Sequence, residues 1–199
     1  MIDQQKLNEL HEEVPPDHYI RGVKYNLFQG LWHKRRQAVV KKALHGQQGG
    51  RILDLGCHSG YLTDYVSSLT KGEVWGIDIS KPAINYGRKH FPQLHFRLGD
   101  IQQRTPFAQG QFDLVTAFDV LEHVPKIDNV IKEARRLIRP GGIFLVGLAL
   151  EKKKLFQVMW KVWKMSRGRV WHHVHVHKFD LKSFRRLMKK HKFTELKLW

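Results

Sequence analysis

The sequence predicts an α/β fold, in which helices cover both faces of a doubly wound, mostly parallel sheet. Short apolar runs alternate with stretches of helical periodicity through most of the chain, which is typical of successive βα units. Three of these runs lead into an acidic residue, at Asp54, Asp78 and Asp100. The carboxyl ends of parallel strands share one edge of a sheet and form its usual ligand site, so we expect the three acids along one rim.

A helical segment precedes the first strand. Residues 27–45 place apolar side chains near helical spacing with basic residues between them, which predicts an amphipathic helix packed on the sheet. The apolar positions are Phe28, Leu31, Trp32, Val39 and Ala43.

The βα units then follow in order. Ser80 and Pro82 mark the start of the helix after the second strand, because serine is a favoured N-cap and proline is favoured just inside a helix. The expected strands are 51–55, 73–78, 94–100, 112–118, 143–150 and 193–199, and the expected helices after the first strand are 60–70, 81–91, 126–138 and 180–191. The sheet is therefore predicted to have six strands, with a shortened C-terminal hairpin.

The turn after the first strand indicates which ligand the rim binds. A dinucleotide fingerprint needs three glycines so that backbone amides can approach a pyrophosphate, whereas this turn has only Gly56 and Gly60. Asp54 adds a negative charge that suits an ammonium group better than a phosphate. Asp78 is placed to accept hydrogen bonds from a ribose diol, and Asp100 from an adenine amine. An amine, a ribose and an adenine together describe S-adenosylmethionine.

At these residues the chain resembles the class I S-adenosylmethionine-dependent methyltransferases, in particular their small-molecule group, over roughly residues 50–148. Residues 119–124 look like the family's segment beside the methyl donor, and Arg139–Gly142 look like its helix-to-strand turn. The resemblance implies a Rossmann-like fold, S-adenosyl-L-methionine as cofactor and an N-terminal helix from which Arg35 or Arg36 reaches the cofactor carboxylate. The implied cofactor contacts are Asp54, Gly56, Cys57, His58, Gly60, Asp78, Ile79, Asp100, Ile101 and Phe118.

One position departs from the family pattern. The family usually has glycine where this chain has His58, because the turn passes close to the methionine part of the cofactor and a Cβ there costs room or strain. We interpret His58 as a residue that keeps the backbone contact. The alternative is a non-catalytic binding module on a methyltransferase fold.

Length and composition fit a single domain of 199 residues. We divide it into an N-terminal helical cap (1–48), a cofactor-binding core (49–150) and a basic lid with the last helix and strand (151–199). Cys57 is the only cysteine, so no intramolecular disulfide is expected. A polar N-terminus without a secretory pattern predicts a cytoplasmic location.

The C-terminal part is strongly basic, because residues 151–199 carry a net charge of +12 out of the chain's +17. Residues 151–165 place Trp160 and Trp163 on an apolar arc opposite lysines, a pattern typical of a helix on an anionic membrane surface. A lid helix that packs its tryptophans on its own domain has the same pattern. Cations interleaved with tryptophans also fit nucleic acid.

Histidines supply the candidates for catalysis. His123 ends the segment after the fourth strand, and His173, His175 and His177 alternate nearer the C-terminus. Alternate imidazoles can ligate zinc, but no cysteine or acid stands beside them in the sequence, so no metal is expected. His123 and His175 are instead the predicted catalytic residues, lining the acceptor pocket as candidate bases.

The predicted activity is methyl transfer from S-adenosylmethionine to a small-molecule or lipid-like acceptor. Because a sulfonium is a good leaving group, the protein mainly has to align the acceptor with the methyl group and exclude water. A nucleic-acid methyltransferase is the alternative, although the sequence contains neither an Asn/Asp-Pro-Pro-Tyr motif nor a Pro-Cys motif. The expected partners are the acceptor and an anionic membrane surface.

Overall fold

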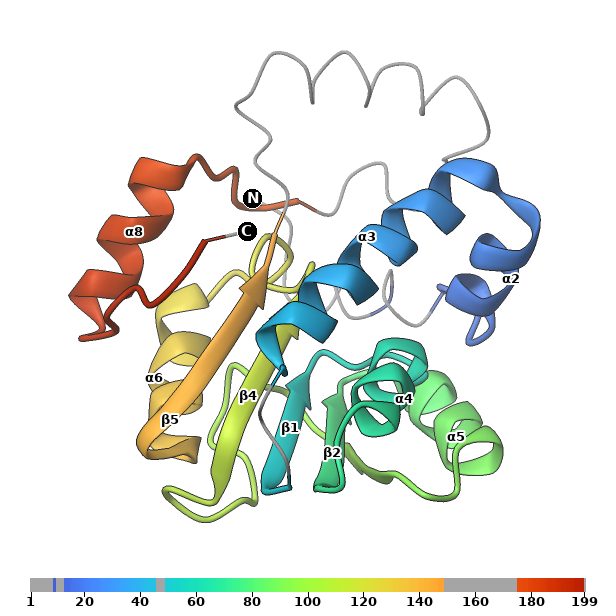
Figure 1. The fold of residues 1–199 in the computed structure, drawn as a ribbon, viewed down its shortest axis with the longest axis horizontal. Helices are drawn as coiled ribbons and strands as arrows, with labels where there is room; N and C mark the ends of the chain where they lie inside the picture. Colours follow the sequence, from blue (N-terminus) through green and yellow to red (C-terminus); the bar gives the residue numbers. More distant parts are fainter. Residues whose placement is uncertain (1–8, 10–12, 46–48, 149–174, 199) are drawn as a thin grey trace.

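The computed structural model describes residues 9, 13–45, 49–148 and 175–198. Within them, five parallel strands form one sheet in the order β3-β2-β1-β4-β5 (Figure 1). The strands are β1 (Arg51–Leu55), β2 (Glu73–Asp78), β3 (His95–Leu98), β4 (Phe112–Phe118) and β5 (Ile138–Gly147). The helices are α2 (His18–Tyr25), α3 (Leu27–Ala43), α4 (Tyr61–Ser68), α5 (Lys81–His90), α6 (Ile127–Leu137) and α8 (Leu181–Lys190). The basic segment 151–171 and His173 lie outside the described residues.

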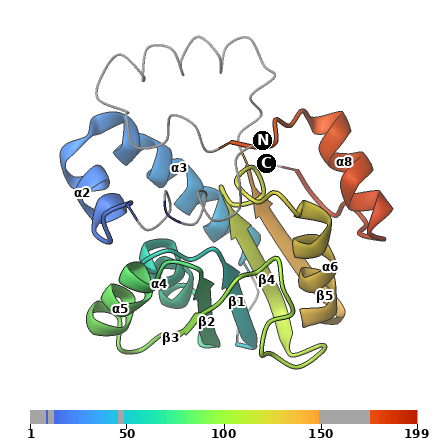
Figure 2. The same cartoon turned by 180° about the vertical axis from the view of Figure 1, so that it is seen from behind.

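Each face of the sheet has its own apolar core. Val40 of α3, Val66 of α4 and Ile84 of α5 belong to one cluster. Ile131 of α6 belongs to the other, against which Phe184 of α8 packs. Figures 1 and 2 show the two groups of helices from opposite sides. Helices on both faces of a parallel sheet are the predicted doubly wound arrangement, and the prediction is confirmed.

The central strands supply both cores by simple alternation. Ile52 of β1 pairs with Leu114 of β4, and both face the core of α3, α4 and α5. The next pair, Leu53 and Val115, faces the core of α6 and α8. This alternation fixes the register, since a slip of one residue would exchange the two faces.

The sixth strand predicted at the C-terminus is not formed in residues 193–198, and β5 is an edge of the described sheet. Lys192 has a left-handed backbone with φ of 61°, which redirects the chain after α8. The Phe193 ring then packs on the Phe144 ring of β5, with centroids 5.3 Å apart. Side-chain packing on the sheet therefore takes the place of strand pairing here.

The buried face of α3 differs from the predicted one. Leu31 and Trp32 are 56% and 41% exposed, whereas His33, Val40 and Leu44 are buried. These three buried residues follow helical spacing, so the helix is amphipathic in space although one of its buried positions is polar. The prediction is wrong for Leu31 and Trp32, whereas Ala43 does pack against the core. The difference arises because α3 turns polar residues inward, toward the cleft described below.

Candidate functional site

The turn between β1 and α4 carries three residues with left-handed backbone conformations. Gly56, His58 and Gly60 have φ values of 68°, 48° and 87°. A Cβ added at Gly56 would lie 2.4 Å from Cγ2 of Val120, which follows β4. The turn therefore needs glycine at position 56 for its conformation and for its close contact with the segment after β4.

Asp54 is buried beneath this turn and accepts two hydrogen bonds. Thr116 of β4 donates its hydroxyl to Oδ1, and Thr63 of α4 donates its hydroxyl to Oδ2, both at 2.7 Å. Burial raises the pKa of Asp54 to about 6, although both hydrogen bonds act in the opposite direction. The carboxyl group thus joins β1, β4 and α4 at the floor of the cleft.

Asp78 at the end of β2 holds the turn from the other side. The backbone N–H of His58 donates to Asp78 Oδ2 at 2.8 Å, and the backbone N–H of Ser80 donates to Oδ1 at 2.8 Å. His58 has an unfavourable left-handed backbone for a non-glycine residue, and this hydrogen bond fixes its amide in place. The departure from glycine is therefore compatible with an ordered turn.

The third acid follows β3 at the same edge of the sheet. The carboxylate of Asp100 accepts a hydrogen bond from the backbone N–H of Gln102 at 2.8 Å. Ile101 is buried in the core of α6 and α8, and Ile79 is partly buried after β2. These three predicted adenine contacts thus follow the two strands beyond the turn and do not line the cleft between the turn and α3.

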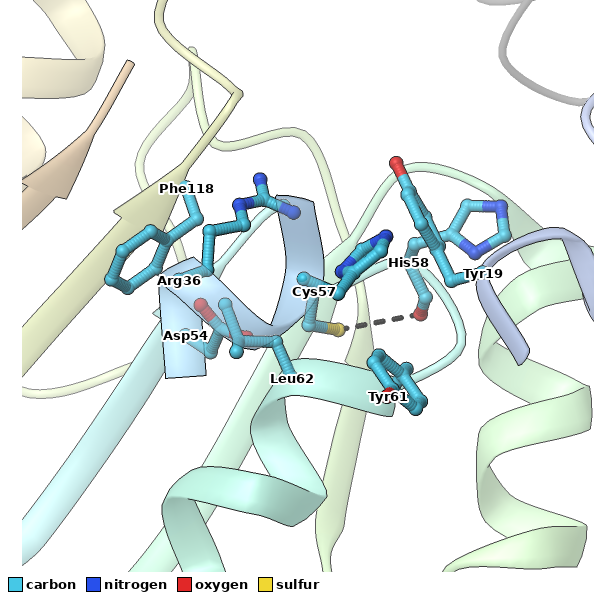
Figure 3. A pocket seen from close by; sticks show the side chains of 10 residues that line it. Tyr19, Arg36, Asp54, Cys57, His58, Tyr61, Leu62 and Phe118 are labelled. Atoms are coloured by element: carbon cyan, nitrogen blue, oxygen red, sulfur yellow. Dashed lines mark hydrogen bonds between the residues drawn. The ribbon is translucent and has the colours of Figure 1, made fainter. Parts of the chain in front are cut away.

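A cleft of about 370 Å³, part of it open to solvent, lies between the turn and the N-terminal helices (Figure 3). Its lining residues are Tyr19, His33, Arg36, Asp54, Gly56, Cys57, His58, Tyr61, Leu62 and Phe118. Five predicted cofactor contacts, Asp54, Gly56, Cys57, His58 and Phe118, are therefore brought together.

Arg36 is the basic residue that α3 places in the cleft. Its guanidinium donates to Asp119 Oδ2 and lies over the Phe118 ring, 5.9 Å from the centroid. Asp119, which directly follows β4, has a left-handed backbone with φ of 51°. Arg35 is exposed, so of the two candidates only Arg36 faces the cleft.

An aromatic cluster joins the N-terminal helices to the turn. The ring of Tyr19 in α2 meets the rings of His33 and His58 edge to face, with centroids 5.5 and 5.1 Å apart. His33 meets Tyr61 of α4 in the same way at 5.4 Å. Burial and, to a smaller extent, the nearby Arg36 lower the pKa of His33 from 6.5 to about 4. His33 is therefore neutral at physiological pH.

The stability of the wild type relative to a His33→Gln variant should depend on pH. The free energy of unfolding of the wild type, compared with that of the variant, should be lower at low pH than at neutral pH. Between pH 4 and 6.5 the unfolded chain binds a proton that folded His33 does not, so this residue's contribution to stability rises with pH through that window. Asp54 acts in the opposite direction, since its pKa is raised on folding, but the comparison with the variant cancels its contribution. The stability difference, wild type minus His33→Gln, should grow by about 2 kcal/mol across the window. Denaturant unfolding at a series of pH values measures it, and a constant difference would contradict the assignment.

The two predicted catalytic histidines lie together. His123 is buried in the turn after β4, His175 is partly buried, and their ring centroids are 4.6 Å apart. His177 instead forms a hydrogen bond with the Val124 carbonyl through Nε2, at 3.0 Å. Residues more than fifty positions apart in the sequence thus meet beside β4.

Sequence reasoning missed Tyr19, His33 and Asp119. Tyr19 belongs to α2, a helix that was not predicted, and His33 was not singled out in the predicted helix 27–45. Asp119 was included only within a motif. The strict spacing of His33 with Val40 and Leu44 is a signal that could have placed His33 on the buried side of α3.

Comparison with known proteins identifies the central region. Residues 53–146 match the family model described as a methyltransferase domain. The ubiquinone biosynthesis O-methyltransferase of Acinetobacter baylyi is 30% identical over 138 residues, which are 66% of this chain and 52% of that protein. The protein of the same name from Alkalilimnicola ehrlichii is 35% identical over 111 residues, which are 54% of this chain and 44% of that protein. The chain thus spans about half the length of these curated relatives.

The fold comparison agrees with the sequence comparison. A SAM-dependent methyltransferase of Thermotoga maritima superposes with a TM-score of 0.65 over 90% of this chain and 82% of its own, at 22% identity. At that identity the likeness establishes the fold alone. Residues 53–146, which the family model and the related sequences match, are thus a methyltransferase domain, and the chain has the fold of the class I S-adenosylmethionine-dependent methyltransferases.

Proposed function

We propose that this protein transfers the methyl group of S-adenosylmethionine to a small-molecule or lipid-like acceptor. The observation that carries the proposal is the cleft beside the turn after β1. There the buried carboxyl of Asp54, the His58 amide held by Asp78, and the guanidinium of Arg36 converge. The Asp54 carboxyl matches the amine of the cofactor, the Asp78 carboxylate matches its ribose hydroxyls, and the Arg36 guanidinium matches its carboxylate.

The residues present fit this cofactor. An ionised carboxylate has about four lone-pair sites, and Asp78 uses its two backbone hydrogen bonds on different oxygens, which leaves acceptor capacity for two ribose hydroxyls. Gly56 has no room for a Cβ, so its backbone remains the surface of the turn. Asp54, Asp78 and Arg36 would hold the methionine and ribose parts, and Ile79, Asp100 and Ile101 the adenine.

When bound, the cofactor supplies an electrophilic methyl group on a sulfonium. The chain's own contribution is to orient the reactants and to exclude water, which accounts for much of the rate in reactions with a good leaving group. The aromatic cluster of Tyr19, His33, His58 and Tyr61 closes the cleft on the side of α2 and α3. His123 or His175 would accept the proton of a hydroxyl acceptor.

The related sequences favour a small acceptor with an oxygen nucleophile. Both relatives described above are named for O-methylation in ubiquinone biosynthesis. We extend this class to the present chain, with a hydroxylated aromatic or lipid-like molecule as the acceptor. The matched relatives give no support to the nucleic-acid alternative.

Replacing Arg36 with glutamine should weaken S-adenosylhomocysteine binding about tenfold or more, because a charge-assisted hydrogen bond to the ligand carboxylate is lost. Binding of 5′-methylthioadenosine, which lacks the amino-acid part, should change little. Calorimetric titration with both ligands tests the proposal.

The matched control for this experiment is Arg35→Gln, which removes an exposed charge from the next position of the same helix. Equal losses for the two ligands would contradict the role of Arg36. Failure of the wild-type protein to bind either ligand would contradict the proposed function itself.

An exposed apolar surface on the N-terminal helices suits a membrane-associated acceptor. Tyr25, Leu27, Leu31 and Trp32 are 72%, 76%, 56% and 41% exposed. Residues 18–43 contain seven lysine and arginine residues and no acid. Within the described residues no helix combines the length and apolar character needed to cross a bilayer. We propose that this surface rests reversibly on anionic lipid, beside the cleft formed by the same helices.

The paired change Leu31→Ser with Trp32→Ser should reduce sedimentation with anionic liposomes at low salt several-fold, because it removes apolar burial while keeping the cations. High salt should weaken the wild-type interaction, since it screens exposed charges. Leu196→Ser, at another exposed leucine, is the control and should sediment like the wild type. Equal binding by the double variant and the wild type would place the lipid contact elsewhere, as in the segment 151–171.

A further inference from the structure

A second group of side chains lies in the turn after β4, outside the lining of the cleft. Glu122 and His123 are buried, and His175 is partly buried. Each offers one atom of a kind that ligates metals, a carboxylate oxygen or a ring nitrogen, and these atoms all lie within 4.8 Å of one another. The two imidazole rings meet edge to face, with an angle of 79° between their planes.

Backbone hydrogen bonds fix this arrangement. The N–H groups of Val176 and His177 both donate to the Glu122 carbonyl, at 2.8 and 3.1 Å. The His177 ring forms a hydrogen bond with the Val124 carbonyl at 3.0 Å. The segment that carries His175 is therefore attached directly to the turn that carries Glu122 and His123. The three side chains meet because these hydrogen bonds join residues 175–177 to residues 122–124.

We propose that Glu122, His123 and His175 bind one divalent transition-metal ion, for which zinc is the best match. Two imidazoles and one carboxylate form the ligand set of a class of catalytic zinc sites, in which the fourth position stays open. Imidazole ligands favour zinc and its neighbours in the first transition row over magnesium or calcium, which prefer oxygen ligands alone.

The spacing requires only a small adjustment. Zinc binds nitrogen and oxygen ligands at about 2.0–2.2 Å, so the ligand atoms of a tetrahedral site are roughly 3.4 Å apart. The present atoms lie within 4.8 Å of one another, and rotation of the side chains can close the difference while the backbone contacts stay in place. No local pattern indicates this site, because Glu122 and His123 are not neighbours of His175 in the chain.

The site lies next to the cleft. Val120, in the same turn, occupies the space against Gly56. Burial raises the pKa of Tyr19, a cleft residue, and the charge of Glu122 adds to this rise. The inference deepens the proposed function and, in its consequence for the acceptor, rests on it. An open position on the ion would take an oxygen donor and favour its deprotonation, so the acceptor would be a hydroxyl compound, and with zinc bound His123 and His175 would act as ligands instead of as free bases.

Zinc binding by the full chain, after chelator treatment and dialysis, tests the site directly. Calorimetric titration with zinc chloride at neutral pH should show one tight equivalent, and cobalt chloride should give the visible absorption of a four-coordinate site. His175→Gln and Glu122→Gln should each weaken zinc binding at least tenfold. His175→Gln is the more informative variant, because His175 is only partly buried and its replacement leaves the core unchanged.

The matched control is His95→Gln, an exposed histidine on β3 that is not part of this group; it should keep the wild-type zinc affinity. Equal zinc affinity in His175→Gln and the wild type, or only weak binding shared by all variants, would overturn the proposal and leave the group as a hydrogen-bonded cluster. Titration with S-adenosylhomocysteine in the presence of chelator separates the two claims. Its failure would reject the proposed function without deciding the metal, whereas normal binding by His175→Gln shows that the variant is folded.

Discussion

Replacing Asp78 with alanine should weaken S-adenosylhomocysteine binding by roughly 30-fold or more, which corresponds to about 2 kcal/mol. Asp78 has two roles that alanine cannot fill. Its charge would strengthen the hydrogen bonds from the ribose hydroxyls, and its Oδ2 holds the His58 amide of the turn. Alanine would therefore remove a contact with the ligand. It would also release the turn after β1, against which the ligand would lie. Calorimetric titration of the purified variant measures the change.

Two further variants separate these roles. Asp78→Asn keeps one acceptor oxygen but loses the charge, so its affinity should lie between the wild type and Asp78→Ala. Asp64→Ala is the control, because this acid on α4 accepts a hydrogen bond from the exposed Gln93 amide and does not line the cleft. Unchanged affinity in Asp78→Ala would remove the ribose assignment.

The order of strands and helices could be predicted because it depends on local patterns. The central strands β1 and β4 contain short apolar runs, and Ser80 does accept a hydrogen bond from the backbone N–H of Ala83, as its N-cap position predicted. The prediction of a C-terminal strand was wrong for a different reason. Residues 193–198 have a suitable composition, but pairing depends on the direction of the chain after Lys192, which no local pattern specifies.

The site could be predicted at positions where an acidic residue at the end of a strand indicates a polar contact. Asp54 and Asp78 are such cases, since both engage the turn or its supports. The inward side of α3 was not predictable in this way. His33 occupies an inward position that an apolar pattern assigns to a hydrophobic residue, because a cofactor cleft requires polar groups inside. Arg36 was named only through the family resemblance, as one of two alternatives.

The contact between His123 and His175 also could not be predicted from local sequence patterns, because the two residues are far apart in the chain. Both were proposed separately as pocket histidines, and the contact between them depends on hydrogen bonds from Val176 and His177 to the Glu122 carbonyl. Glu122 could therefore not be predicted as a partner of the alternate histidines, although it immediately precedes His123 in the sequence.

Replacing Gly56 with alanine should destabilise the protein by about 2–4 kcal/mol and should also abolish most cofactor binding. The left-handed backbone costs alanine about 1–2 kcal/mol, and the added Cβ would lie 2.4 Å from Cγ2 of Val120, so the turn or the segment after β4 must move. Gly49 provides the matched control, because its φ is also positive, at 83°, but nothing lies within 4 Å of an added Cβ. Gly49→Ala should therefore show only the backbone cost and should bind the cofactor normally.

A double-mutant cycle with Val120→Ala isolates the steric part of this effect. If the clash with Val120 is responsible, Gly56→Ala combined with Val120→Ala should be less destabilised than the sum of the two single changes, because the second substitution removes the methyl group that the first one meets. Cofactor affinity should recover in part, while the cost of the left-handed alanine remains. Strict additivity of the two free energies of unfolding, measured by chemical denaturation, would mean that the turn relaxes away from Val120. The close contact between the two segments would then not be what requires glycine at this position.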